Sequence, residues 1–226
     1  MSLKLRYLGA LLALLTLMSG CGDSTPTRAK EVIKKETHSS ITSAAIAIPD
    51  NYGAQVAEDI LNSGGNAVDA AVATGFALAV TFIDAGNIGG GGFMAVKMDN
   101  DIAFLDYREK APLTAHKDMY LDEQGNVIDS ITLIGGQAAG VPGTVAGFWE
   151  AHKRFGKLPW EDVVQPAIDL AANGFIPAPI LVDSIHSMQQ RFDGKTNFND
   201  YFNHINSSKV FKQPELAKTL ARIAEF

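Results

Sequence analysis

A run of four consecutive glycines at residues 89–92 constrains this chain more than any other feature of its sequence. Glycine has no side chain to pack and loses the most backbone freedom on folding, so it destabilises the interior of a helix or strand. Such a run is tolerated where the backbone takes a positive φ or lies very close to other atoms. It therefore predicts a tightly packed loop around which neighbouring elements are arranged.

Two short strands are predicted directly after the glycines. Residues 93–96 are apolar, residues 98–101 suit a hairpin turn, and residues 102–107 suit the returning strand. Because side chains alternate across a strand, two different faces are expected. One face carries Phe104, Asp106 and Arg108, and the other carries Ala103, Leu105 and Tyr107.

Arg108 ends the returning strand beside the glycine loop, and this is a suitable place to hold a carboxylate. A guanidinium offers a planar pair of donors that matches the two carboxylate oxygens. The structural alternative is a salt bridge at a strand end. Asp106 lies on the same face, so its side chain either meets Arg108 or faces a cleft together with it.

Composition narrows the class of protein. The chain has 226 residues, 46% of them hydrophobic, which suits one domain with a substantial core. The net charge of −6, without a cluster of basic residues, argues against a nucleic-acid partner. The single cysteine excludes an internal disulfide, and the five histidines are far apart, so no metal site is predicted. Phosphate-loop, dinucleotide-binding and Gly-x-Ser-x-Gly motifs are absent from the sequence, and no cofactor is predicted.

The N-terminus predicts export across the inner membrane. Lys4 and Arg6 precede residues 7–18, an apolar run that is shorter than the roughly 20 residues of a membrane-spanning helix. A basic start, a short apolar region and a small Ser-Gly pair are typical of a signal peptide, here residues 1–20.

The only cysteine, Cys21, directly follows that small pair. Residues 17–21 resemble a bacterial lipoprotein signal, in which this cysteine is lipidated and becomes the first residue. We therefore expect a periplasmic protein anchored to a bacterial membrane through Cys21, with residues 21–43 as a polar, flexible tether. An ordinary secretion signal with a chance cysteine is the alternative.

The body of the chain, residues 44–226, alternates apolar segments with glycine and proline. Residues 44–49 predict a buried strand that stops at Pro49. Helices are predicted over residues 53–63, 67–80, 144–155, 160–173, 180–190 and 213–225, with a turn at residues 122–126 and a loop over residues 191–207.

Three helix details follow from single residues. Asn66 is expected to cap the helix over residues 67–80, and Asp69 suits its positive N-terminus as a capping residue rather than a catalytic one. Thr144 is a candidate cap for the next helix. Pro166 is expected to kink the helix over residues 160–173 or to lie at a break in it.

Several of these segments together resemble the γ-glutamyltranspeptidase family. The matching segments are residues 64–73, 85–94, 106–112, 141–147, 160–175 and 213–225, so the resemblance covers about residues 44–225. It implies an α+β fold, the αββα four-layer sandwich of the N-terminal-nucleophile hydrolases. This chain is expected to form an incomplete half of that sandwich, truncated at its C-terminus.

The resemblance also implies γ-glutamyl transfer or hydrolysis, with glutathione as a donor and water, amino acids or peptides as acceptors. Family precursors cut themselves into a large and a small subunit, and the N-terminal threonine of the small subunit is the nucleophile. That threonine is expected beyond Phe226, so no catalytic residue is assigned within this chain. The 226-residue chain alone is expected to be inactive, and its expected partner is the small subunit.

By the same resemblance, Arg108 matches the arginine that binds the α-carboxylate of the γ-glutamyl group. One segment departs from the family pattern, because residues 81–84 replace a common His-Pro or Pro-His pair before the glycines. Two rival readings remain. One is another N-terminal-nucleophile amidohydrolase, such as a cephalosporin acylase-like enzyme, and the other is a catalytically inactive, truncated lipoprotein.

Overall fold

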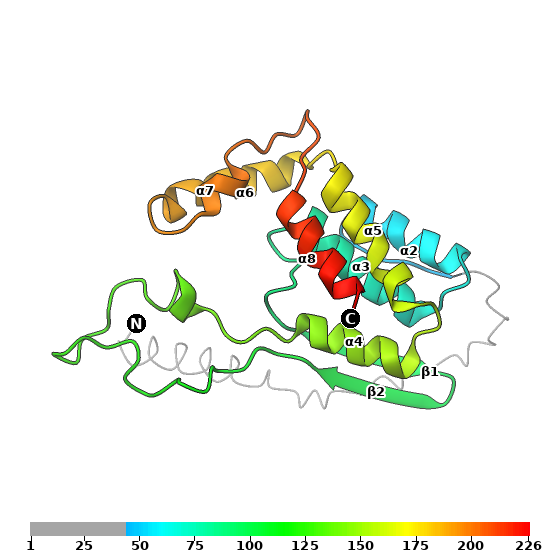
Figure 1. Cartoon of the computed structure of the whole chain (residues 1–226), viewed down its shortest axis with the longest axis horizontal. Coiled ribbons are helices and arrows are strands. Elements are labelled where there is room, and N and C mark those ends of the chain that lie inside the picture. Colours follow the sequence, from blue (N-terminus) through cyan, green and yellow to red (C-terminus); the bar gives the residue numbers. More distant parts are fainter. Residues whose placement is uncertain (1–43) are drawn as a thin grey trace, which may run out of the picture. The chain divides into compact units, whose positions relative to one another are not determined.

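The computed structural model describes residues 44–226. The predicted signal peptide, Cys21 and nearly all of the predicted tether lie outside the described residues. Within the described part, helices surround one central helix, and a β-hairpin lies beside them (Figure 1).

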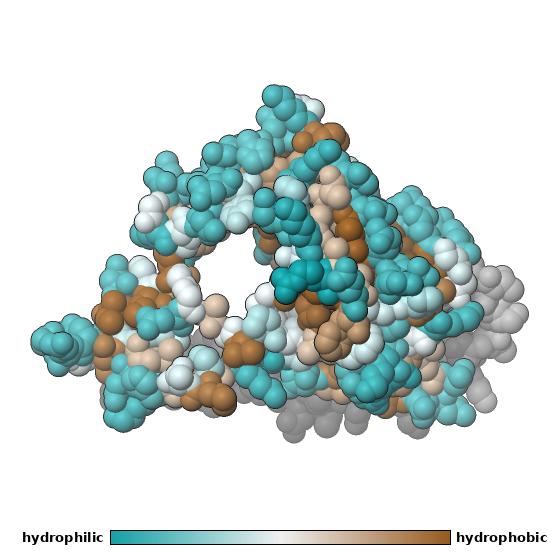
Figure 2. All heavy atoms as spheres, in the orientation of Figure 1, coloured by the Kyte–Doolittle hydropathy of each residue, from teal (hydrophilic) through white to brown (hydrophobic). Residues whose placement is uncertain are grey.

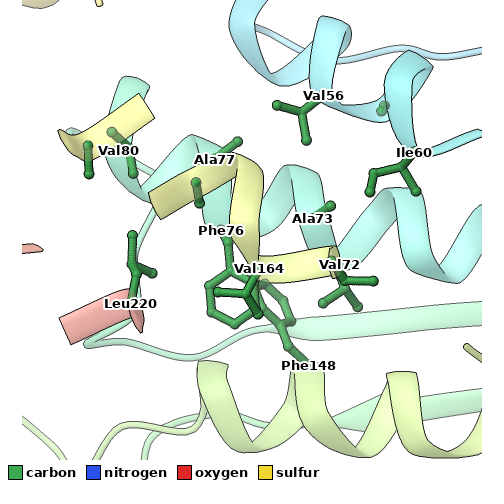
Figure 3. Packing of buried hydrophobic residues seen from close by; sticks show 14 of the residues in the cluster. Val56, Ile60, Val72, Ala73, Phe76, Ala77, Val80, Phe148, Val164 and Leu220 are labelled. Atoms are coloured by element: carbon green, nitrogen blue, oxygen red, sulfur yellow. The ribbon is translucent and has the colours of Figure 1, made fainter. Parts of the chain in front are cut away.

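The central helix is α3 (Ala67–Thr81), which packs against α2 (Asn51–Asn62), α4 (Thr144–Phe155) and α5 (Trp160–Asn173). Its sequence is apolar all round, as expected of a helix that is buried on several sides. Phe76 is fully buried and makes edge-to-face contacts with Phe148 and Trp160, with ring centroids 5.1 and 5.6 Å apart. Figure 3 shows Phe148 of α4 reaching toward Phe76 of α3.

The remaining helices follow α5 in the chain. They are α6 (Pro179–Phe192), the short α7 (Phe198–Phe202) and α8 (Pro214–Ala224). The amphipathic α8 packs on α5 and buries Leu220 completely, as its apolar side predicts. A 3₁₀ helix, η1 (Gly136–Ala138), lies in the long segment before α4.

The hairpin consists of β1 (Phe93–Met98) and β2 (Asp101–Asp106), which pair antiparallel from Phe93↔Asp106 to Met98↔Asp101. The predicted hairpin is confirmed, and its turn contains Asp99 at a φ of 50°. One face of β2 buries Leu105 and contacts α4, whereas Phe104 is 67% exposed on the other face. This is the division of faces that the alternation of side chains predicts.

The predicted strand at residues 44–49 is wrong. These residues are largely exposed and form no strand, although Ile48 packs against the helical core. A strand needs a neighbour for its backbone groups, and within residues 44–226 the sheet contains only β1 and β2. The apolar composition of residues 44–49 correctly indicated a contact with the core, but it did not indicate a strand.

The structure decides against a break at Pro166 and against Thr144 as a helix cap. Helix α5 runs through Pro166 without a break, and Val163, Val164 and Ala167 around it are fully buried. Burial of this face holds the helix together despite the missing proline N–H. Thr144 is the first residue of α4 rather than its cap, because Gly143 occupies the cap position. The predicted loop over residues 191–207 contains the short α7.

Residues 81–84, where the resemblance leads one to expect a His-Pro or Pro-His pair, begin at the last residue of α3. The Thr81 hydroxyl donates hydrogen bonds to the carbonyl oxygen of Ala77, 3.1 Å away, and to the carboxylate of Asp50. Asp50 also caps α2 by accepting hydrogen bonds from Tyr52 N–H and Gly53 N–H. Thr81 therefore joins the end of α3 to the start of α2.

Candidate functional site

Within the glycine run, Gly91 serves close backbone approach rather than positive φ. Among the described glycines, those with positive φ lie elsewhere in the chain. A Cβ added at Gly91 would lie 2.7 Å from the carbonyl oxygen of Tyr107 and 2.7 Å from the nitrogen of Glu109. These are backbone atoms on either side of Arg108, so only glycine fits against this stretch without displacing it.

The same loop holds the N-terminus of α4. The carbonyl oxygen of Gly90 accepts hydrogen bonds from Gly143 N–H and Thr144 N–H, at 2.8 and 3.1 Å. Asn87 Oδ1 accepts from Gly90 N–H at 2.8 Å and from the Thr144 hydroxyl at 2.7 Å. These bonds satisfy N–H groups that the first turn of a helix leaves unpaired. The glycine loop and α4 are thereby fixed to each other.

Tyr107 locks the end of the hairpin onto α4. A Cβ at Gly147 would lie 2.2 Å from Tyr107 Cγ, so the absence of a side chain on α4 makes room for the ring. The ring contacts Phe148 edge-to-face at 5.8 Å, and the hydroxyl donates to the carbonyl of Phe93 at 3.3 Å. Burial raises the pKa of the Tyr107 phenol. The residue immediately before Arg108 is therefore held on two sides.

Arg108 itself points away from this packing. Its side chain is 63% exposed, and its Nε donates to Glu109 Oε2 at 3.2 Å. The carboxylate of Asp106 accepts from the backbone N–H of Arg108 at 3.0 Å. The guanidinium thus forms its ion pair with Glu109, whereas the carboxylate of Asp106 accepts a hydrogen bond from the backbone N–H of Arg108.

The charge pair affects the protonation of Glu109. Its own backbone N–H, followed by the Arg108 side chain, lowers the pKa of the Glu109 carboxyl below its usual value. Hydrogen bonds to the ionised form have this effect. Glu109 therefore stays ionised beside Arg108.

A cleft of about 440 Å³ lies beside the end of β2 and one face of α4. Asp106 and Arg108 both line this cleft. Of the two alternatives that the sequence left open, the structure therefore supports the one in which both residues face a cleft. Three further charged side chains line the cleft: Lys110, Glu150 and Arg154. Figure 1 shows α4 running alongside β2.

Asp69 has the capping role that its position predicts. It is fully buried, and its carboxylate accepts from Asn66 N–H at 2.9 Å while the Asn66 side chain caps the helix in return. The same carboxylate accepts from Lys157 N–H at 3.0 and 3.1 Å, and it lies 3.6 Å from His152 Nε2. Asp69 thus fastens α3 to the connection between α4 and α5.

The sequence reasoning missed two neighbours of Arg108. Glu109 follows it directly and holds its Nε, and Phe93 lies beneath the guanidinium with 5.8 Å between Cζ and the ring centroid. The hairpin register could have revealed the contact with Phe93. Phe93 pairs with Asp106, which lies two residues before Arg108 on the same face of the strand.

Residues 44–226 show neither a metal-binding cluster nor a membrane-spanning helix. Within them, acidic, histidine and cysteine side chains form no group of three that could hold a metal ion. No helix in this part of the chain has the length and apolar character needed to cross a membrane. On the face shown in Figure 2, hydrophobic surface occurs as separate patches among larger hydrophilic areas.

Solved structures share this fold. A gamma-glutamyltranspeptidase from Pseudomonas nitroreducens, complexed with L-DON, is 58% identical with a TM-score of 0.79, and the match covers 81% of this chain and 55% of that chain. The gamma-glutamyltranspeptidase of Helicobacter pylori is 41% identical with a TM-score of 0.77, over the same shares. The predicted class is confirmed: an α+β fold of the N-terminal-nucleophile hydrolase type, of which this chain spans a part.

The family profile described as Gamma-glutamyltranspeptidase matches residues 53–226. The chain belongs to the gamma-glutamyltranspeptidase family. A glutathione hydrolase proenzyme of Pseudomonas aeruginosa is 58% identical over 186 residues, which cover 82% of this chain and 33% of that protein. A glutathione hydrolase proenzyme of Escherichia coli is 44% identical, covering 80% and 32%. The chain thus spans about a third of the length of these relatives.

A cephalosporin acylase from Bacillus halodurans also has a similar structure, with a TM-score of 0.67. At 24% identity this likeness shows the fold alone. It therefore gives no support to the acylase reading over the transpeptidase reading.

Proposed function

We propose that the complete gene product hydrolyses γ-glutamyl amides such as glutathione and transfers the γ-glutamyl group to amino acid or peptide acceptors. Membership of the family supports this reaction, as do relatives named glutathione hydrolase proenzymes. The observation that carries the proposal is the exposed guanidinium of Arg108, fixed at a strand end beside a cleft.

In this proposal Arg108 binds the α-carboxylate of the γ-glutamyl group. Glu109 engages Nε, and among the described residues this is the only hydrogen bond of the Arg108 side chain. The two terminal nitrogens are available to a ligand, and their planar fork fits a carboxylate in two parallel hydrogen bonds. The glycine loop and Tyr107 supply the rigid support that accurate placement of substrate requires.

The chemical step is proposed to use the N-terminal threonine of a small subunit cut from the same precursor. Its hydroxyl attacks the γ-carbonyl while its own amine accepts the proton, and the amine of the leaving group departs. Water or an acceptor amine then releases the γ-glutamyl group from the threonine. The names of the relatives as proenzymes support a precursor that is processed.

The location of the enzyme is a separate proposal. Export by the signal at residues 1–20 and lipidation of Cys21 place it on the periplasmic side of a bacterial membrane. Incorporation of a fatty-acid probe in wild type, and its loss in Cys21→Ser, is the expected result. Equal labelling of both proteins contradicts lipidation at Cys21.

The activity is tested with the complete gene product and γ-glutamyl-p-nitroanilide. We expect release of p-nitroaniline, with acceleration by an acceptor such as glycylglycine. Hydrolysis of a cephalosporin side-chain amide without γ-glutamyl hydrolysis would instead support the acylase reading. A well-folded gene product that cleaves neither substrate would support the inactive lipoprotein.

A further inference from the structure

The Arg108 guanidinium lies over an aromatic ring. Its Cζ is 5.8 Å from the ring centroid of Phe93, within the distance of about 6 Å at which a cation is attracted to an aromatic face. Phe93 in turn stacks on Phe104, with centroids 5.6 Å apart and planes inclined by 23°. One large aromatic side chain, Phe93, thus lies next to the proposed carboxylate-binding arginine, and a second, Phe104, stacks on the first.

The hairpin register produces this arrangement. Phe93 pairs with Asp106, and Phe104 is the diagonal neighbour two residues earlier on the same face of β2. The ladder continues one residue further, where Tyr107 N–H donates to the carbonyl of Gly92 at 3.0 Å. Arg108 therefore leaves the strand on the same face as Phe104 and immediately beyond Phe93.

Core packing does not account for Phe93. Its side chain is 52% exposed, whereas Val96 and Leu105 fill the buried face of the hairpin. Within residues 44–226, the aromatic and cationic groups that contact the Phe93 ring are Phe104 and Arg108.

We propose that Phe93 is a positioning residue for carboxylate binding by Arg108, with Phe104 as its support. This inference rests on the proposed γ-glutamyl activity. The Phe93 ring attracts the guanidinium from one direction, with Cζ 5.8 Å from its centroid, and Glu109 accepts a hydrogen bond from Nε, so the position of the group is restrained by two partners. The edge with the two terminal nitrogens then faces the substrate, and less ordering is needed when the carboxylate binds.

The test uses the complete gene product and steady-state kinetics with γ-glutamyl-p-nitroanilide. Phe93→Leu keeps an apolar side chain but removes the aromatic face, and we expect KM to rise about threefold to fivefold with kcat within about twofold. Phe93→Tyr keeps the face and is expected to restore the wild-type KM. Ile102→Ala, on the same exposed face of β2, is the matched control and is expected to leave KM unchanged.

A double-mutant cycle separates positioning from general loosening. If Phe93 acts through Arg108, Phe93→Leu causes no further loss of kcat/KM in an Arg108→Ala background. Equal losses in both backgrounds, or an unchanged KM in Phe93→Leu, would overturn the inference while leaving the proposed function intact. A wild-type protein without γ-glutamyl activity would remove both proposals.

Discussion

The helical core around α3 and the hairpin that carries Arg108 are built in different ways. Phe76 and its neighbours are buried by α4 and α5, and the stability of this region comes from helix-on-helix packing. The hairpin buries one face on α4 and leaves the other open, with Ile102 80% exposed and Phe104 67% exposed. The residues that hold the fold are thus distinct from those that present Arg108, the proposed ligand-binding group.

Substitution in the helical core is expected to have the largest effect on stability. Phe76→Ala in the complete gene product removes a fully buried ring and should lower the free energy of unfolding by about 3–5 kcal/mol. KM for γ-glutamyl-p-nitroanilide should stay unchanged well below the melting temperature, because Phe76 does not line the cleft. Thermal unfolding and steady-state kinetics check these two expectations. A raised KM at low temperature would show that Phe76 affects substrate binding as well as stability.

Removal of Arg108 should have the opposite pattern. Arg108→Ala deletes a charged donor pair and is expected to raise KM by roughly tenfold to a hundredfold, with little loss of stability because the side chain is exposed. Arg154→Ala is the control, since Arg154 lines the same cleft and has no proposed contact with the donor. Equal effects of the two substitutions would indicate a general charge effect rather than a specific clamp.

The glycine run offers a matched pair. Gly91→Ala brings a Cβ to 2.7 Å from backbone atoms beside Arg108, whereas a Cβ at Gly89 meets nothing within 4 Å. We expect Gly91→Ala to cost about 1–3 kcal/mol of stability, as overpacking does, and Gly89→Ala to cost about 0.5 kcal/mol or less. Chemical denaturation measures both. Similar losses would show that backbone freedom, rather than close approach, explains the run.

The smallest expected effect concerns Glu109 and pH. Because its folded-state pKa is lowered from 4.5, the ionised carboxylate stabilises the fold above that value, and the contribution is lost as pH falls through the lowered pKa. Wild type should therefore be slightly more stable than Glu109→Gln at neutral pH, and the difference should disappear in acid. Unfolding curves across the acid range measure it, and a difference that grows as pH falls would contradict the Arg108–Glu109 pair.

Local patterns predicted most of the elements. The Asn66 cap and the apolar sequence after it were sufficient for α3, and alternation was sufficient for the two faces of the hairpin. Residues 44–49 could not be assigned in this way, because a strand depends on a neighbour that composition does not reveal.

The candidate site was predictable only in part. The position of Arg108 followed from a strand end beside glycines, and its proposed role came from the resemblance to the family. The hydrogen bond from Lys157 N–H to Asp69 joins residues that are 88 positions apart in the sequence, so it depends on tertiary packing. The approach of the Arg108 guanidinium to the Phe93 ring depends on register, which a sequence alone fixes less firmly than the existence of a hairpin.

The most direct test of Arg108 as a carboxylate clamp is a crystal structure of the complete gene product with a bound γ-glutamyl ligand. We expect the α-carboxylate to accept two parallel hydrogen bonds of about 2.7–2.9 Å from the terminal nitrogens of Arg108, while Nε still donates to Glu109. A ligand whose α-carboxylate is bound by other residues, with Arg108 paired only to Glu109, would contradict it.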